Sequence, residues 1–460
     1  MAIESATISA SLARFVASLD YDSIPSPLRE KARLHLLDSV GVALASSRFE
    51  FAERAHAGLR RFGAGDYPVI GMRGTLALRD AILMNGILVH GIEFDDTSSV
   101  GRIHPSATCI PCALGVGALT RASGKALLAA YVAGVECAIR IGAAGRGGFS
   151  PAGFNATGVV GGFGAVMVAG KLLGLDAQQL ASAQGIVYST ASGSRESVAS
   201  DAWTKRFDPA WAAVGAVTAV MLAAEGFQGP RSPYEGKFGF YRVYLRHDVA
   251  QEDLDAITNA LGIQWRFESL SLKALPSCYF NHPLINATIE IVTRHDIAPC
   301  AIRSIRVSLP QAGFNTVCEP RALKLAPGDI SGAQFSAYYN VACAAVRRRL
   351  TLDDLRPASL QDPQVLALAR NVTYADDPGS CFPRHYTGAV EIETVDGRRL
   401  SAREDINKGS SEAPLTQAEV ERKFMDNAAA VLSRPRAEEL RDALLGIDRV
   451  ADVSGIALCL

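Results

Sequence analysis

Apolar residues recur at helical spacing along most of the first 268 residues. Residues 28–45 show this pattern directly after Ser26 and Pro27, which suit the N-cap and the first position of a helix. Residues 78–90 and 126–141 repeat the pattern. Alanine, glycine and serine dominate three more stretches, residues 158–170, 185–193 and 211–226. Helices with such small side chains pack closely against one another, so the pattern predicts a large helical body.

The pattern changes after about residue 270. Residues 302–309 alternate apolar and polar side chains, as a strand with one buried face does. Residues 388–400 alternate in the same way and are interrupted by Asp396 and Gly397, a strong hairpin signal. The helical pattern returns after residue 407, where Thr416 and Glu419 form a capping box ahead of an apolar run. A small α+β unit is therefore predicted between the helical body and a helical tail.

Composition narrows the class of protein. The 460 residues include 46 Lys and Arg against 47 Asp and Glu, which leaves a net charge of -1. A non-specific nucleic-acid binder needs a basic excess to neutralise phosphates, so we expect no nucleic-acid partner. A disordered chain would have low hydrophobicity and high net charge, whereas 48% of these residues are hydrophobic. Since single cores stop growing beyond roughly 250–300 residues, the length predicts two domains.

Cysteine usage and the apolar segments indicate the cellular compartment in which the protein is expected and whether it crosses a membrane. The nine cysteines are odd in number and scattered, which favours reduced thiols in a cytoplasmic protein. The first 15 residues lack a basic segment followed by an apolar core, so they do not resemble a secretory signal. The apolar stretch at residues 159–169 ends at Gly170 and Lys171, short of the roughly 20 residues that span a membrane. We therefore expect buried core helices and no membrane partner.

Several cofactor motifs are incomplete. Cys109 and Cys112 have CxxC spacing, but no second pair completes a zinc site, and the run around them resembles the start of a buried helix. Residues 161–164 are glycine-rich without matching GxGxxG, and Lys171 is followed by Leu172 where a P-loop requires Ser or Thr. Neither GxSxG nor HExxH occurs. A site that works without metal or organic cofactor is what these patterns predict.

The densest polar cluster lies between two apolar helical segments and comprises His90, Glu93, Asp95, Asp96, Thr97, Arg102 and His104. Such a cluster can be a solvated loop whose acidic residues cap the next helix. Its position between apolar helices instead brings part of it towards the core, where buried carboxylates need partners. A histidine beside them is oriented and titrates near neutral pH, which favours a functional site.

Two further clusters stand at predicted helix starts. Asn155 and Thr157 precede the small-residue helix and either cap it or leave its N–H groups to an anion. Lys205 and Arg206 open another helix, where two cations are unfavourable for the helix dipole. An anion that compensates them comes from a ligand or from the protein, and the sequence leaves both options open.

A fourth cluster, with Lys273 and Cys278, lies at the predicted join between domains, a common place for small-molecule sites. Burial and neighbouring cations lower the pKa of a lysine and allow it to act as a base. Cys278 as a nucleophile would need a base close by, so a small buried residue is the favoured interpretation.

These clusters, in this order, resemble the MmgE/PrpD family, which includes 2-methylcitrate dehydratase, cis-aconitate decarboxylase and iminodisuccinate epimerase. The resemblance extends over nearly the whole chain. It rests on residues 36–43, 85–86, 94–97, 104–106, 157–158, 163–164, 170–174, Lys205, Lys273, 276–278, His282, 334–336, Tyr339, 408–409 and 420–424.

The resemblance implies a mainly α fold. A large all-helical domain is formed by both ends of the chain, residues 1–268 and 405–460, and residues 269–404 form an inserted smaller α+β lid domain. The hydrophobic pattern reaches the same division. The resemblance also implies a homodimer, an active site between the two domains, no metal or organic cofactor, and small di- or tricarboxylate substrates.

Residue by residue, the catalytic pocket of the family corresponds to Thr97, His104, Lys205, Lys273 and Tyr339. Two positions depart from the pattern: Glu93 stands where the family usually has Asp, and Asn155 where many members have His. Asparagine keeps a hydrogen bond but transfers no proton at neutral pH. This puts in doubt any activity that needs a histidine at position 155.

These residues predict a cofactor-independent, dehydratase-like lyase that removes a proton next to a carboxylate of a small di- or tricarboxylate. Lys273 is the predicted base, His104 its acid partner or a carboxylate orienter, and Lys205 and Tyr339 complete the catalytic set. The predicted substrate-binding residues are Glu93, Thr97, Arg102, Asn155, Arg206 and Cys278. An epimerase of the iminodisuccinate epimerase type is the first alternative, and a non-catalytic binding homologue is the second.

Overall fold

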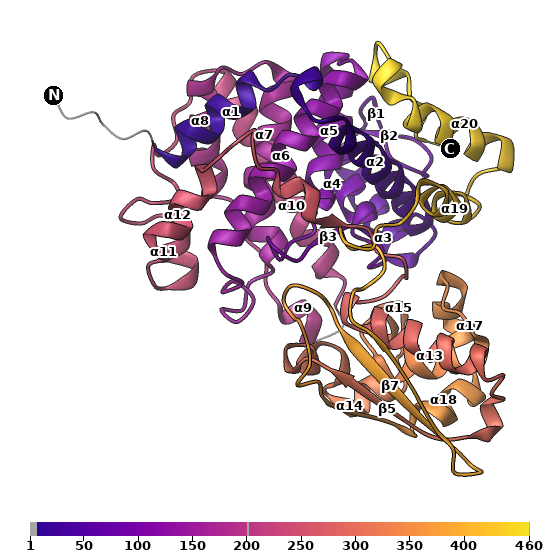
Figure 1. Ribbon diagram of the computed structural model, residues 1–460. Helices are drawn as coiled ribbons and strands as arrows, with labels where there is room; N and C mark the ends of the chain where they lie inside the picture. The colour runs from indigo at the N-terminus through magenta and orange to yellow at the C-terminus, as the bar shows by residue number, and fades with distance from the viewer. Residues whose placement is uncertain (1–6, 200–201, 460) are drawn as a thin grey trace. The chain divides into compact units, whose positions relative to one another are not determined.

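A computed structural model describes residues 7–199 and 202–459 of the chain (Figure 1). It divides into two compact units, which we treat separately. Unit 1 combines residues 1–91, 95–270 and 416–460, and unit 2 combines residues 92–94 and 271–415. Helices predominate among the described residues, which confirms the predicted mainly α class.

Unit 1 is helical, with only short strands among its described residues. Its helices are α1 (Ile8–Ser18), α2 (Ser26–Ser46), α3 (Glu50–Leu59), α4 (Leu78–Val89), α5 (Ser106–Thr120), α6 (Gly124–Ala144), α7 (Ala156–Leu173), α8 (Ala177–Tyr188), α9 (Glu196–Ala199), α10 (Thr204–Ala224), α11 (Phe240–Leu245), α12 (Gln251–Thr258), α19 (Gln417–Ala428) and α20 (Arg434–Leu445). The short strands are β1 (Tyr67–Pro68), β2 (Thr75–Leu76) and β3 (Thr97–Ser98), while β4 (Leu270–Ser271) lies where the chain passes from one unit to the next.

Helix α7 is central to unit 1, because it packs against α5, α6, α8 and α10. Close approach of α6 and α7 depends on two glycines. A Cβ on Gly134 would lie 2.3 Å from Val168, and a Cβ on Gly164 would lie 2.8 Å from Ala138. The small residues of this helix therefore serve packing, as the composition predicted. The stretch 185–193 is only partly helical, since α8 ends at Tyr188 and serine, threonine and glycine follow it.

Three helices of unit 1, α6, α7 and α10, are long and apolar enough by length and composition to cross a membrane. The expectation that residues 159–169 are too short was wrong, because α7 extends that stretch to 18 residues. Within the protein, 89% of the apolar window of α6 and 83% of that of α7 are buried, against 61% for α10. Packing inside unit 1 accounts for the apolar character of α6 and α7.

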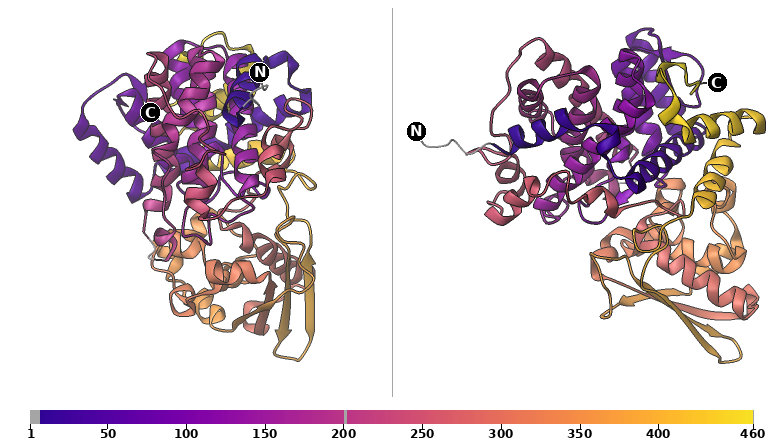
Figure 2. Two further views of the ribbon diagram at one scale, coloured as in Figure 1. Left: turned by 90° about the vertical axis from the view of Figure 1, so that its left-hand side faces the viewer. Right: turned by 45° about the horizontal axis from the view of Figure 1, so that its top comes forward.

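Unit 2 joins a four-stranded sheet to helices (Figure 2). The strands are β5 (Ile302–Leu309), β6 (Val372–Asp376), β7 (Gly388–Thr394) and β8 (Arg399–Glu404), in the order β6-β5-β7-β8. Strand β5 runs parallel to β6 and antiparallel to β7, and the hairpin to β8 turns through Gly397 at φ 87°. The helices are α13 (His282–Arg294), α14 (Arg321–Leu325), α15 (Ile330–Gln334), α16 (Ala337–Arg347), α17 (Pro357–Leu360) and α18 (Pro363–Ala369).

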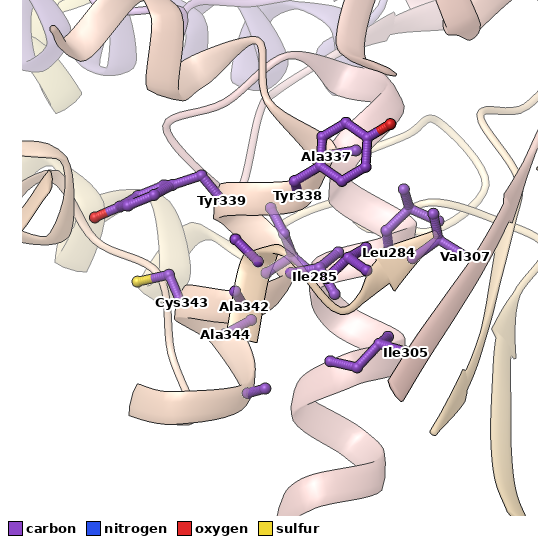
Figure 3. Packing of buried hydrophobic residues seen from close by; sticks show 14 of the residues in the cluster. Leu284, Ile285, Ile305, Val307, Ala337, Tyr338, Tyr339, Ala342, Cys343 and Ala344 are labelled. Carbon is purple, nitrogen blue, oxygen red and sulfur yellow. The ribbon is translucent and has the colours of Figure 1, made fainter. Parts of the chain in front are cut away.

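The core of unit 2 forms where α13 and α16 meet the sheet. Leu284 and Ile285 of α13 contribute to one buried cluster with Ile305 and Val307 of β5 and with residues of α16 (Figure 3). Alternation along β5 places its apolar side chains on the covered face, as the sequence pattern predicted. The capping box of Thr416 and Glu419 is present at the start of α19, which confirms that prediction.

Candidate functional site

A chain of hydrogen bonds links Asp95, His90 and Lys205 in unit 1. His90 caps the C-terminal end of α4, and its Nδ1 lies 2.7 Å from Oδ2 of Asp95, with both side chains fully buried. Its Nε2 lies 3.1 Å from Nζ of Lys205 in the first turn of α10. This arrangement brings together residues from three segments, and it joins a carboxylate and an amine through one imidazole.

His104 lies beside this chain, with its ring centroid 5.1 Å from that of His90. Its Nδ1 is 2.7 Å from the backbone carbonyl oxygen of Asp96, which can only accept, so Nδ1 carries a hydrogen. Nε2 is therefore the ring nitrogen that takes up or releases a second proton. The side chain is 23% exposed whereas that of His90 is fully buried, so His104 is the histidine that a ligand in solution reaches.

The Asp96 carboxylate is buried and holds the loop ahead of α5. It accepts hydrogen bonds from Nδ1 of His35 at 2.9 Å, from the hydroxyl of Ser106 and from the backbone N–H of Ser106 at 3.3 Å. Ser106 Oγ also lies 2.6 Å from the hydroxyl of Tyr131. Burial lowers the pKa of His35, which favours its neutral form. The backbone carbonyl of Asp96 therefore orients the His104 ring, while the Asp96 carboxylate anchors the loop.

Asn155 caps α7, because its Oδ1 accepts the backbone N–H of Thr157 at 3.2 Å. Its Nδ2 donates to Oδ2 of Asp208 at 3.0 Å, and the hydroxyl of Thr157 accepts the N–H of His104 at 3.1 Å. Burial raises the pKa of Asp208, while the bond from Asn155 and the nearby His90 and Lys205 oppose that rise. The capping interpretation of Asn155 is confirmed, and anion binding at α7 stays a prediction.

Two of the predicted cations have contacts with the protein itself. The Arg206 side chain is buried, with its Nε donating to the Gly91 carbonyl at 2.6 Å and its Cζ 4.4 Å from the Phe51 ring centroid. Exposed Arg102 has φ 53° and lays its guanidinium over Gly147, where a Cβ would approach within 1.9 Å. These contacts give Arg206 a structural role, and substrate binding by Arg102 stays a prediction.

Unit 2 holds a buried ion pair between Lys273 and Glu93, with Nζ 3.3 Å from Oε2. Glu93 has φ 50°, in the left-handed region. The side-chain amide of Gln334, at the end of α15, donates to the carbonyl of Ile92 and, at 3.2 Å, to that of Pro276. Gln334 therefore ties the segment that carries Glu93 to the loop that follows Lys273.

Cys278 and Tyr339 lie in the core of unit 2. The Cys278 N–H donates to the carbonyl of Gln334 at 3.0 Å, and its thiol is buried. The Tyr339 hydroxyl donates to the carbonyls of Asp354 at 2.7 Å and Ser359 at 3.1 Å, and burial raises the pKa of this hydroxyl. In Figure 3 its ring points away from the strand residues of β5. These bonds indicate a structural role for Tyr339.

Sequence models of the MmgE/PrpD N-terminal and C-terminal domains match residues 10–253 and 275–448 respectively. The chain belongs to the MmgE/PrpD family. The family assignment made from the motifs is therefore confirmed.

Curated relatives of this MmgE/PrpD protein carry the name of a lyase. A cis-aconitate decarboxylase-like protein, oryM, from Aspergillus oryzae is 26% identical and covers 97% of this chain and 96% of its own. The cis-aconitate decarboxylases of Aspergillus terreus and Mus musculus are 25% and 24% identical over 97% of this chain, and over 94% and 92% of their own. The chain is an enzyme of the MmgE/PrpD family, and these relatives favour a lyase-like activity over the epimerase alternative.

The structure distributes the predicted site residues of this MmgE/PrpD enzyme over both units. Unit 1 holds Thr97, Arg102, His104, Asn155, Lys205 and Arg206, while unit 2 holds Glu93, Lys273, Cys278 and Tyr339. The sequence placed His90 and Asp95 in the polar cluster without an individual role for either, and it predicted no role for Asp208. Asp208 follows Lys205 by three residues, one helical turn, and that spacing is the signal that could have identified it. Across residues 7–199 and 202–459, no group of three His, Cys, Asp or Glu side chains is placed to hold a metal ion.

Proposed function

We propose that this enzyme is a cofactor-independent lyase of the dehydratase type, acting on a small di- or tricarboxylate. The observation that carries the proposal is the hydrogen-bonded set Asp95, His90 and Lys205 beside the partly exposed His104. A protonated amine binds a carboxylate through a charge-assisted hydrogen bond. The imidazole of His104 beside it supplies the acid that an elimination requires.

The reaction begins when a lysine in its neutral amine form removes a proton from the carbon next to a substrate carboxylate and becomes an ammonium. The electrons of that C–H bond form the new double bond, while the neighbouring C–O bond breaks and its electron pair leaves with oxygen. His104 in its protonated form donates a proton from Nε2 to the departing hydroxide, which leaves as water. Cations placed where negative charge develops lower the barrier, and the ammonium formed on the base is one of them.

The identity of residue 155 favours dehydration over decarboxylation. Asn155 uses its oxygen to cap α7 and its amide nitrogen to bind Asp208, and it transfers no proton at neutral pH. Members that resemble this chain but carry histidine there have one more acid. A decarboxylase would need another proton donor for the carbon that loses carbon dioxide.

Decarboxylation of cis-aconitate is the second candidate function. It is favoured by the names of the curated relatives, which match over nearly the full length of both chains. The two lyase reactions give different products, so one assay separates them.

Proton NMR in deuterated water provides that assay, with cis-aconitate, citrate and 2-methylcitrate as substrates. A dehydratase makes or consumes an alkene signal without losing a carboxylate, whereas a decarboxylase releases carbon dioxide from cis-aconitate. Tricarballylate, which lacks both hydroxyl and double bond, is the matched control and reports proton exchange alone.

His104→Asn keeps a donor for the Asp96 carbonyl but removes Nε2, and we expect kcat to fall about 10²-fold or more. Binding of these acids without any turnover would contradict the proposal.

A further inference from the structure

Lys205 donates a hydrogen bond to a buried imidazole, and this constrains where the protons lie. An ammonium group only donates, so Nε2 of His90 accepts from Nζ of Lys205 across 3.1 Å. Nδ1 then carries the hydrogen that His90 donates to the Asp95 carboxylate at 2.7 Å. Ionisable neighbours of this pair include His104, at the His90 ring, and Asp208, one turn along α10.

The same heavy-atom positions accommodate a second distribution of protons with an equal total charge. If the proton moves from Nζ to Nε2, the N–H bond of the ammonium breaks and an N–H bond forms on His90. Lys205 becomes a neutral amine, and the new imidazolium donates Nδ1–H to the Asp95 carboxylate. A fully buried carboxylate stabilises that imidazolium, as the acid of a catalytic triad does.

We propose that His90 and Asp95 are positioning residues that make Lys205 a proton-transfer group instead of a fixed positive charge. The inference rests on the proposed lyase function and deepens it. In the amine form, rotation about the Cε–Nζ bond turns the Nζ lone pair from His90 to the substrate carbon. There it takes the proton, and the C–H electron pair enters the double bond. His104 protonates the leaving hydroxide, which departs as water. His90 then releases its extra proton to solvent and His104 takes one up from solvent, which restores the starting protonation states.

A lysine that only anchored a carboxylate would need no proton acceptor behind it. His90 and Asp95 are both buried. Burying an imidazole and a carboxylate costs free energy unless their polar atoms have hydrogen-bond partners, so the contact of His90 with Lys205 is part of what makes this burial possible. Lys205 is then a candidate for the catalytic base, as an alternative to Lys273. Variants of the two lysines are therefore measured separately.

Lys205→Arg is the first test, because arginine keeps the positive charge and binds carboxylates but does not deprotonate in proteins. A proton-transfer role predicts a fall in kcat of about 10²–10⁴-fold. An anchoring role predicts a change mainly in KM with kcat retained, and that result would overturn the inference.

His90→Gln is the matched variant for the imidazole. Its amide oxygen reaches towards the position of Nε2 and accepts from Lys205, yet the amide holds no extra proton. We expect kcat to fall about 10²-fold with little change in KM. The double variant His90→Gln with Lys205→Arg should have a kcat only slightly below that of Lys205→Arg alone. The effects of substituting residues that act as a unit are strongly non-additive. Full additivity of the two losses, or unchanged kcat in His90→Gln, would overturn the proposal.

Nitrogen NMR of the full-length protein labelled at histidine tests the proton positions without any substrate. The His90 signals are identified as those lost in His90→Gln. The inference predicts that the hydrogen lies on Nδ1, which faces the Asp95 carboxylate. A neutral His90 with its hydrogen on Nε2 would overturn the inference while leaving the proposed lyase function standing. Failure of every substrate in the turnover assay would instead overturn the function and leave this result intact.

Discussion

The Lys273 ammonium and the Glu93 carboxylate meet inside unit 2 with Nζ 3.3 Å from Oε2, although 180 positions separate them in the chain. Both side chains are almost fully buried. Breaking a buried pair by removing one charge leaves the other uncompensated, which destabilises proteins by about 3–5 kcal/mol. The pair therefore carries consequences for both stability and catalysis.

Comparing Lys273→Ala with Glu93→Gln separates the effect of the pair on stability from its effect on catalysis. If Lys273 is the base that the family resemblance implies, kcat with the true substrate falls about 10²–10⁴-fold. Glu93→Gln keeps the shape of the acid and leaves the amine in place, so it serves as the matched control for lost stability. Steady-state kinetics and urea denaturation of both variants provide the measurement. Unchanged turnover by Lys273→Ala would show that the base lies elsewhere, with Lys205 as the candidate.

A second buried pair, Lys423 of α19 and Asp38 of α2, makes stability depend on pH, with Nζ 2.6 Å from Oδ1. Burial raises the pKa of Asp38 to about 6, while Lys423 opposes the rise. A carboxyl group with a higher pKa in the folded than in the unfolded state binds more protons when folded. Its contribution to stability therefore declines as pH rises from about 4 to about 6.

Lys423→Met removes the opposing charge, so the pKa of Asp38 rises further and the decline extends to higher pH. We expect a loss of about 3 kcal/mol in the free energy of unfolding at pH 8, and a smaller loss at pH 5. Urea denaturation at the two pH values measures the difference. Lys423→Met combined with Asp38→Asn is the control, since it lacks the titrating carboxyl group. A loss that is equal at both pH values would contradict this account.

Arg140 of α6 clamps the segment that follows α12. Its Nε donates to Glu136 at 2.6 Å, and its two terminal nitrogens donate to the carbonyls of Asn259 at 2.7 Å and Gln264 at 2.6 Å. Glu136 accepts the backbone N–H of Phe267 at 2.7 Å. Arg140→Met should cost about 3–5 kcal/mol, because a buried carboxylate and several carbonyls lose their partner.

Hydrogen exchange provides the local measurement for this clamp. Faster exchange confined to residues 256–267 in Arg140→Met would agree with the clamp, and an unchanged rate there would contradict it. Arg242→Met is the matched surface control, since the Arg242 ion pair with Asp248 is exposed and such pairs contribute about 0–1 kcal/mol.

Tyr339→Phe tests whether this tyrosine is catalytic, as the resemblance implied, or structural, as its hydrogen bonds indicate. Loss of the hydroxyl leaves the buried Asp354 carbonyl and the half-buried Ser359 carbonyl without that donor, which costs about 1–3 kcal/mol. We expect lower thermal stability with kcat within a few-fold of the wild type. A fall in kcat of about 10²-fold at unchanged stability would restore the catalytic assignment.

Local patterns were sufficient where a structure is formed by neighbours in the chain. The alternation at residues 302–309 and the capping box at Thr416 and Glu419 involve contacts within a few residues, and both are present. The family assignment also followed from short motifs in order. The helix containing residues 159–169 was underestimated, because tertiary packing supports α7 beyond the apolar core of its sequence.

The partners of the charged residues could be identified only from the folded chain. Two cations at a helix start indicated a compensating anion, yet Arg206 bonds a carbonyl and covers Phe51, and Lys205 bonds His90 from 115 residues away. No periodicity encodes such distant contacts, because they depend on how whole helices pack.

The order of apolar and polar residues was therefore enough to establish a mainly helical chain with a strand-containing segment before its tail. The ordered motifs established the resemblance to the MmgE/PrpD family, since short-range spacing specifies elements and motifs. Which carboxylate faces which amine was decided only by tertiary packing. Asp95, His90 and Lys205 become one hydrogen-bonded set because α4 and α10 pack side by side, and burial there makes each of these polar atoms depend on the others.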